Sequence, residues 1–428
     1  MDFKYLTSTN GIGGRIKQLP SDFIVEEIGI NYETKLTYLP DKKIEDLNWD
    51  KVYTDKEALP KKFNYLFVTL EKNNLSTTTA IAQLARYIHL SKNRIGYAGL
   101  KDKRAISVQR ISIFDPPKER ISKFYFRDIK IYDPDWKHKR IDIGDLKQNR
   151  FIVTIRQITG FTKEEISSIV GQFIDQVNQN GLINYFGEQR FGGSRDITHE
   201  VGKLLLKKNY KDAIILYLTK PSELEYPEVK EARLALAKDL DFGKHAAYFP
   251  SDGGYERAML NYLANNPTDF LGALKVLPKS VQYLFIHAYQ SYLFNKLINL
   301  RIEKGYTLKP IDGDIINKEN GIVQIQLFGF TSKFSEGVAG QMEKELFESE
   351  EINFSDFYNE EYSVLSSKGI SRDIETKAFD LKLIDIAEDQ LNKETIPDSL
   401  KLTLSFTLDK GQYATILLRE LIKKEFIG

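Results

Sequence analysis

The stretch GYAGLKDKRA, residues 96–105, and the stretch ISVQRISIF that follows it, residues 106–114, are the most informative part of the chain. Two glycines allow the backbone to bend before alternating side chains that predict a strand over 106–114. The bend carries one carboxylate, Asp102, and three cations, Lys101, Lys103 and Arg104. Because nearby cations favour the ionised form, Asp102 is expected to be a carboxylate at neutral pH. Such a group shapes a turn or acts as a nucleophile, and the turn alone leaves both interpretations open.

The segments around this stretch mix strands and helices without a regular βαβ order, which indicates an α+β fold with a largely antiparallel sheet. Short apolar runs and 3.6-residue spacing are the signals used. The predicted strands cover 63–70, 106–114, 151–158 and 402–408, and the predicted helices cover 76–90, 162–181, 280–304 and 413–424. The helix that begins at Thr162 is expected to open with a capping box to Glu165 and to end at Gly181.

The length of 428 residues favours two domains. The middle of the chain differs from its ends, because it holds the longest helical pattern and then an acidic stretch over 334–362, with nine acids against Lys344. We interpret residues 193–370 as an inserted α+β domain between two parts of one catalytic domain, residues 1–192 and 371–428.

Composition excludes several chemistries. The chain has no cysteine, so disulfides, thiolate nucleophiles and cysteine zinc sites are ruled out, and its five histidines are not spaced as metal ligands. The first residues have no apolar core and no later run is long enough to span a bilayer, so we expect no membrane association and a cytoplasmic protein, or a nuclear one in a eukaryote. The net charge is +1, yet residues 86–110 hold seven cations against Asp102 alone, which suits either a polyanion partner or an ordinary solvated face.

Residues 98–109, AGLKDKRAISVQ, resemble the signature of the TruD family of pseudouridine synthases. Three further elements follow in the family's order: NYFGEQRFG over 184–192, QSYLFN over 290–295 and GQYATILLREL over 411–421. Chance explains one such match but not four in order, and the resemblance extends from about Gly14 to the C-terminus. Gln148 and Asp409 depart from the family's pattern, which usually has Gly and Pro there.

The resemblance implies an enzyme that isomerises a uridine of tRNA, most often at position 13, without metal or other cofactor. It places the nucleophile at Asp102 and an active-site lysine at Lys17. Asn149 and Phe151 match the family's Asn-x-Phe, whose ring stacks on the target base, and Glu27 aligns with a family glutamate. The resemblance also implies a pseudouridine-synthase catalytic domain with an inserted TRUD domain. The expected RNA contacts are Lys101, Lys103, Arg104 and Arg190.

Physical chemistry agrees with these roles. A base in a folded tRNA must be unstacked, at a cost of a few kcal/mol, before an enzyme reaches its glycosidic carbon. Stacking on Phe151 offsets roughly 1–3 kcal/mol of that cost. Lys17 is expected to hold Asp102 by a charge-assisted bond, and the carboxylate stabilises the positive character that grows on the sugar.

Other interpretations stay open at this point. The same chemistry could act on other tRNA sites, small nuclear RNA or messenger RNA. An RNA-binding or tRNA-folding module without chemistry is the main alternative of another class, although a carboxylate amid the cations would repel phosphate. A dinucleotide-binding enzyme is disfavoured, because Gly11-Ile12-Gly13-Gly14 lacks the helix and acidic partner of that fingerprint. The oligomeric state is not determined by the sequence, and we expect a monomer.

Overall fold

The structure is a computed structural model that describes residues 3–36, 47–193, 195–249 and 254–423. The chain forms two compact units. The sheet unit comprises Leu6–Leu182 and Lys377–Gly428, and the helical unit comprises Met1–Tyr5 and Ile183–Thr376. The inserted domain predicted over 193–370 falls within the helical unit, and its limits remain a prediction.

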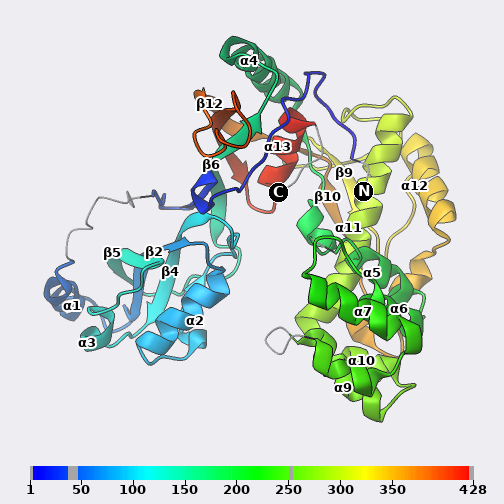
Figure 1. Cartoon of the computed structure of the whole chain (residues 1–428), viewed down its shortest axis with the longest axis horizontal. Helices are drawn as coiled ribbons and strands as arrows, with labels where there is room; N and C mark the ends of the chain where they lie inside the picture. Colours follow the sequence, from blue (N-terminus) through cyan, green and yellow to red (C-terminus); the bar gives the residue numbers. More distant parts are fainter. Residues whose placement is uncertain (1–2, 37–46, 194, 250–253, 424–428) are drawn as a thin grey trace. The chain divides into compact units, whose positions relative to one another are not determined.

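The sheet unit is built on an eight-stranded sheet with the order β12-β13-β6-β1-β4-β2-β5, in which β3 also pairs with β4 (Figure 1). The parallel pairing of β1 with β4 is the exception among its described strand pairs, which are otherwise antiparallel. The predicted α+β class with a largely antiparallel sheet is therefore confirmed. The strands are β1 (Phe23–Gly29), β2 (Tyr65–Asn73), β3 (Ile95–Tyr97), β4 (Ile106–Phe114), β5 (Ile129–Lys137), β6 (Leu146–Ile158), β12 (Ala378–Glu388) and β13 (Leu400–Asp409).

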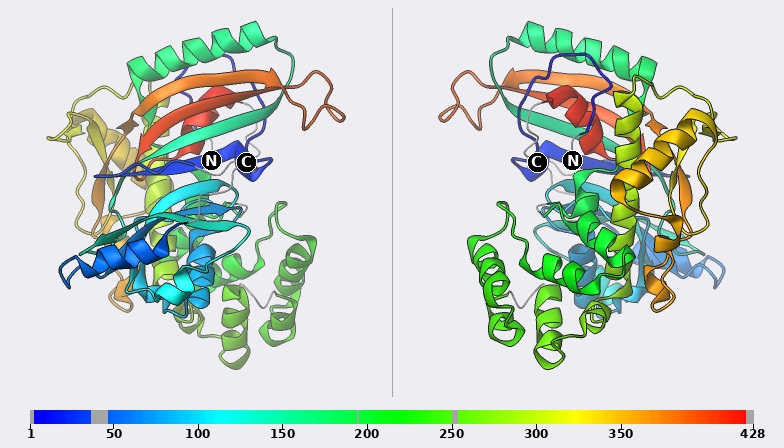
Figure 2. Two further views of the ribbon diagram at one scale, coloured as in Figure 1. Left: turned by 90° about the vertical axis from the view of Figure 1, so that its left-hand side faces the viewer. Right: turned by 90° about the vertical axis from the view of Figure 1, so that its right-hand side faces the viewer.

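Two hydrophobic clusters stabilise this sheet. One joins apolar side chains of β1, β6 and β13 to α4 (Lys163–Asn180) and α13 (Ala414–Ile422). Figure 2 shows α4 running beside the orange strand β12. The other joins β2, β4 and β5 to α2 (Thr77–Tyr87). It also includes a side chain of α3 (Lys118–Ile121), and side chains of α1 (Trp49–Glu57) pack against it. In the strand order, the parallel pair β1–β4 lies between the strands of the two clusters, and Asp102 lies in the loop that leads into β4.

The predicted segments correspond closely to the observed ones. The strand over 106–114 has the predicted bounds, and β2 continues three residues beyond its predicted end at Leu70. Helix α4 opens with the predicted capping box of Thr162 and Glu165, and Gly181 ends it with a φ of 70°. Helix α13 was predicted over 413–424, and Lys424 lies outside the described residues.

The helical unit packs its helices around the 25-residue helix α11 (Lys279–Glu303), which was predicted over 280–304. A three-stranded antiparallel sheet covers part of it, in the order β10-β9-β8. The short strands β7 (Leu182–Ile183) and β11 (Glu375–Thr376) pair with each other. The remaining elements are α5 (Thr198–Leu206), α6 (Tyr210–Thr219), α7 (Pro227–Asp239), α8 (Phe242–His245), α9 (Tyr255–Asn265), α10 (Phe270–Lys275), β8 (Ile315–Ile316), β9 (Val323–Leu327), α12 (Gly337–Glu350) and β10 (Ile370–Asp373). Across the described part of the chain, no helix has the length and apolar character needed to cross a membrane.

Candidate active site

Asp102 lies in the loop between β3 and β4, and its side chain keeps 29% of its surface exposed. Its Oδ2 atom is 3.4 Å from Nζ of Lys17, whose side chain is 10% exposed. Lys17 has a φ of 56°, in the left-handed region that residues with a side chain rarely adopt. Such backbone strain persists where the surrounding structure enforces it, and it is frequent at functional sites. The predicted pair of Lys17 and Asp102 is thus brought together, with the carboxylate open to solvent.

Aromatic rings lie beneath this ion pair. Nζ of Lys17 is 4.2 Å from the centre of the Phe23 ring, a cation–π contact. Phe23 meets Phe151 edge to face, with ring centres 5.8 Å apart. Phe151 in turn stacks on Phe406, at 5.3 Å and 22° between the ring planes. Phe151 is only 7% exposed, so one face of its ring is already occupied within the hydrophobic cluster.

Glu27, Lys101 and Asn149 form a buried polar network next to these rings. Glu27 on β1 faces Asn149 on β6 across the antiparallel pair. Nζ of Lys101 lies 2.7 Å from Oε2 of Glu27 and donates to Oδ1 of Asn149, also at 2.7 Å. The side chains of Lys101 and Glu27 are 4% and 0% exposed. The ion pair therefore fixes Lys101 inside the sheet unit, where it orients the Asn149 amide.

The other carboxylate oxygen of Glu27 accepts two hydrogen bonds. Its Oε1 accepts a hydrogen bond from the Tyr32 hydroxyl at 2.8 Å and another from the backbone N–H of Arg110 at 3.1 Å. Burial and the carboxylate of Glu27 raise the pKa of Tyr32 well above its ordinary value, so that its hydroxyl remains a donor. These bonds compensate the loss of hydration that burying a carboxylate entails.

Lys72 is a residue of this site that the sequence analysis missed. Its side chain lies at the end of β2 and the residue is 0% exposed. Nζ donates to the backbone carbonyl of Asp102 at 2.7 Å and to that of Leu75 at 2.6 Å. Burial lowers the pKa of Lys72 to about 8, against the opposing effect of Asp102. A lysine at the end of an apolar strand was the available signal, but nothing in the sequence linked it to a loop 30 residues later.

The cations adjacent to Asp102 in sequence take other directions. Lys103 is exposed, and the guanidinium of Arg104, which is also exposed, donates to the backbone carbonyl of Gln18 at 3.0 Å. The expectation that Lys101 lies at the carboxylate is corrected, because its Nζ is held by Glu27 and Asn149. Successive residues of a loop point in different directions, and Lys17, far away in sequence, contacts the carboxylate.

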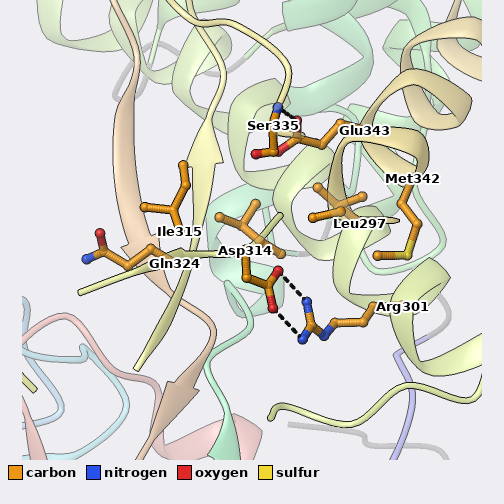
Figure 3. A pocket seen from close by; sticks show the side chains of 10 residues that line it. Leu297, Arg301, Asp314, Ile315, Gln324, Ser335, Met342 and Glu343 are labelled. Atoms are coloured by element: carbon orange, nitrogen blue, oxygen red, sulfur yellow. Dashed lines mark hydrogen bonds and ion pairs between the residues drawn. The ribbon is translucent and has the colours of Figure 1, made fainter. Parts of the chain in front are cut away.

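Arg190 belongs to the helical unit, where its Nε donates to Oγ of Ser291 at 3.1 Å and its guanidinium lies over the Phe186 ring. The same unit has a small hollow between α11, β8, β9 and α12 (Figure 3). Its volume is about 10 Å³, which is room for at most one water molecule and far too little for a base. It is lined by Leu297, Arg301, Asp314, Ile315, Gln324, Ile325, Ser335, Ala339, Met342 and Glu343.

The described residues contain no cluster of three or more His, Cys, Asp or Glu side chains arranged to hold a metal ion. The side chains gathered around Asp102 are instead a carboxylate, ammonium groups, an amide and phenyl rings. This set can bind and orient an organic substrate by charge, hydrogen bonds and stacking. A partly exposed carboxylate beside an ammonium is suited to stabilising positive charge or attacking an electrophilic carbon.

A family model described as tRNA pseudouridine synthase D (TruD) matches residues 2–326 and 316–421. A protein of Methanosarcina acetivorans named "Probable tRNA pseudouridine synthase D" is 34% identical, over 98% of this chain and 95% of that protein. A protein of Methanocaldococcus jannaschii named "Probable tRNA pseudouridine synthase D 1" is 33% identical, over 99% of this chain and 98% of that protein. A crystal structure described as tRNA pseudouridine synthase D (TruD) from Methanosarcina mazei superimposes with a TM-score of 0.77 at 32% identity, covering 98% of this chain and 96% of the other.

Proposed function

Because the chain belongs to the TruD family of tRNA pseudouridine synthases, enzymes that isomerise uridine in tRNA, we propose that Asp102 is its nucleophile and that its target is the uridine at position 13. The observation that carries the first part is the 3.4 Å contact between Lys17 and the partly exposed Asp102 carboxylate. The position within tRNA rests on the family resemblance.

The isomerisation breaks the bond from the sugar C1′ to N1 of the base, turns the base, and forms a bond from C1′ to C5. C5 then loses its proton, and N1 takes one up. No atoms are gained or lost, so the protein must hold a detached uracil while the sugar carries positive character. The Asp102 carboxylate stabilises that charge by attack or by proximity. Lys17 keeps the carboxylate in place through a charge-assisted contact. Confinement of the base makes its return to the sugar much faster than its escape.

Phe151 is proposed to contact the target base. Its ring already stacks on Phe406, so the base must approach from the side that Phe23 borders. With 7% of Phe151 exposed, full stacking requires a shift of the neighbouring side chains when RNA binds. Lys17 contacts the Phe23 ring by a cation–π interaction and also contacts Asp102, so it connects the aromatic rings to the carboxylate.

Glu27, Lys101 and Asn149 are proposed to act as positioning residues, each of which orients the next. Glu27 is fully buried, so it acts on the reaction through Lys101, and Lys101 through Asn149, whose amide is half-buried and is the member that can reach substrate. Lys101 was expected to bind RNA. Its buried ion pair with Glu27 favours a role in orienting Asn149 instead. Lys103 and Arg104, which are exposed, and Arg190 remain proposed RNA contacts.

The test is substitution of Asp102 by Asn, which keeps the size and removes the charge, and by Ala. Both variants are expected to lose pseudouridine formation, by about 10²-fold or more, in unmodified tRNA mapped at every uridine. Their affinity for tRNA, measured by filter binding, is the control and should stay within a few-fold of the wild type. Normal turnover by either variant would reject Asp102 as nucleophile, and wild-type product at a site other than 13 would reject the proposed position.

Because its substrate is tRNA, we propose that the protein works in the cytoplasm. A monomer remains our expectation for its oligomeric state. Analytical ultracentrifugation of the free protein and of its complex with tRNA tests that expectation directly.

A further inference from the structure

Residues 123–127, KFYFR, form a short segment between α3 and β5 in which exposed and half-buried side chains alternate. Tyr125 is 80% exposed, and Lys123 and Arg127 on either side of it are exposed as well. Phe124 and Phe126 point the other way and pack against the second hydrophobic cluster. An exposed tyrosine between two exposed cations is therefore presented by a segment whose other side chains are anchored.

The anchoring is made by Tyr87 at the end of α2. Its ring meets those of Phe124 and Phe126 edge to face, with centres 5.4 and 5.9 Å apart. Its hydroxyl also donates to the backbone carbonyl of Lys123. These contacts fix the backbone on both sides of Tyr125. A ring that is held in this way binds a flat ligand with little loss of conformational entropy.

The end of β2 joins this segment to the Asp102 loop. Nζ of Lys72 donates to the carbonyl of Asp102, as described above. The backbone N–H of Asn73 donates to the carbonyl of Asp128 at 3.0 Å, and that of Asn74 donates to the carbonyl of Ala105 at 3.0 Å. Three consecutive residues, Lys72 to Asn74, thus hold both segments at the C-terminal end of β2.

Charge along the chain favours the same location. Residues 47–145, which include β2 to β5, hold 20 Lys or Arg against 12 Asp or Glu, whereas the remaining residues hold 41 against 48. The total of +1 therefore conceals a positive part and a negative part. A polyanion is attracted to the positive part, and the attraction is sensitive to salt.

We propose that Lys123, Tyr125 and Arg127 form a second tRNA-contact surface beside the active site, in which Tyr125 stacks on an unpaired base and the two cations contact phosphates. The proposal rests on the proposed function for its substrate. Every base has a π-face, so a stacking tyrosine contributes affinity without selecting a sequence. The surface would hold the strand that flanks the target uridine after the target itself has been extruded.

The test compares Tyr125→Ala with Tyr226→Ala, because Tyr226 is also 80% exposed but lies in the helical unit beside Glu225. Tyr125→Ala is expected to raise the Kd and KM for tRNA about fivefold or more, as loss of one stacked base does. The single-turnover rate at saturating tRNA should not change. Tyr125→Phe should restore wild-type binding, and Tyr226→Ala should leave binding unaltered.

Arg127→Gln provides an independent measurement. Loss of one phosphate contact should lower the slope of log Kd against log salt concentration by roughly 0.7 to 0.9. Unchanged Kd in Tyr125→Ala together with an unchanged salt slope in Arg127→Gln would overturn the inference. A wild-type protein that binds tRNA through Tyr125 but makes no pseudouridine would refute the proposed function and leave this surface intact.

Discussion

At the scale of single residues, the site depends on two lysines that reach Asp102 from different strands and loops. Lys17 contacts the carboxylate and Lys72 holds the backbone carbonyl of the same residue. The first supplies a charge at the reacting group, and the second fixes the loop that carries it. Substitution of either lysine is predicted to affect activity and stability in ways that can be measured separately.

Lys17 adopts a φ of 56°, which a glycine adopts without strain. Lys17→Ala and Lys17→Gly remove the same ammonium group, so both are expected to reduce kcat by about 10²-fold with little change in the KM for tRNA. Glycine relieves the backbone strain that alanine retains. The free energy of unfolding of Lys17→Gly should therefore exceed that of Lys17→Ala by up to about 1 kcal/mol. Urea unfolding of the pair measures this difference. A less stable glycine variant would show that the backbone at this position is not strained.

Lys72→Met removes two hydrogen bonds, one to the carbonyl of Asp102 in the loop and one to the carbonyl of Leu75 just before α2. We expect kcat to fall at least about tenfold while the KM changes little. The pKa of Lys72 is about 8 in the folded protein and near 10.5 in the unfolded chain, so the unfolded chain binds more protons between these values. Wild-type stability should therefore gain from this group as pH rises from about 8 to 10.5.

Thermal unfolding at pH 8 and pH 10 measures that gain. The Lys72→Met variant should lack it, and Lys72→Arg, which stays charged throughout, is the matched control. Identical pH dependence in the wild type and Lys72→Met would contradict the lowered pKa of Lys72.

At the scale of elements, two side chains that depart from the expected family pattern are in contact. Gln148 on β6 and Asp409 on β13 are register partners, and Nε2 of Gln148 donates to Oδ1 of Asp409 at 3.0 Å. The sequence presented these as two separate departures, and strand pairing joins them into one contact. The ends of β6 and β13, which flank the strand residues Asn149 and Phe151, are thereby held together.

Helix α12 carries a buried carboxyl group at the hollow of the helical unit (Figure 3). Glu343 accepts hydrogen bonds from the N–H and Oγ of Ser335, at 2.6 and 3.0 Å. Burial raises the pKa of Glu343 above its ordinary value of 4.5, the bonds from Ser335 oppose this rise, and Asp314 adds to it. Because the folded pKa is raised, the protonated group contributes stability that is fully present below about pH 4.5 and is lost as pH rises through the folded pKa.

Glu343→Gln keeps the size of the side chain and cannot ionise. The wild type is expected to lose stability relative to this variant as pH rises from 4.5 towards neutrality. Denaturant unfolding followed by Tyr fluorescence at several pH values measures the difference. Parallel stability curves for the two proteins would contradict the raised pKa of Glu343.

At the scale of the whole molecule, the chemistry is predicted to belong to the sheet unit alone, with no metal or organic cofactor. The proposed groups Lys17, Glu27, Asp102, Asn149 and Phe151 all lie in that unit. Isomerisation transfers no electrons to another molecule, so side chains suffice for the reaction that we propose. The positive part of the chain over 47–145 lies in the same unit and is expected to attract the tRNA.

The corresponding prediction concerns metal removal. Protein dialysed against EDTA is expected to retain its full rate on unmodified tRNA that is folded in high monovalent salt. Native gel mobility of the tRNA controls for its fold under these conditions. Recovery of a lost rate by added Zn²⁺, with the tRNA fold unchanged, would contradict a cofactor-free reaction.

The sequence by itself determined the segments that it predicted, the α+β class and the candidate nucleophile, whereas strands such as β1, which carries Glu27, were not predicted. The predicted features follow from local patterns: the alternation over 106–114, the capping box at Thr162, and the motif around Asp102. Such patterns can be interpreted without knowing which strands pair, because helix and strand propensity and periodicity depend on residues close together in the sequence.

The tertiary structure decided which charges meet. The sequence grouped Lys101, Lys103 and Arg104 with Asp102 because they are neighbours along the chain, whereas the sheet brings Lys17 to the carboxylate across 85 residues and Lys72 to its carbonyl across 30. Lys101 turned inward to Glu27 because the pairing of β1 with β6 places a buried carboxylate and an amide within its reach. Side-chain direction depends on strand register and on the parallel pairing of β1 with β4, and neither is written in the spacing of residues along one segment.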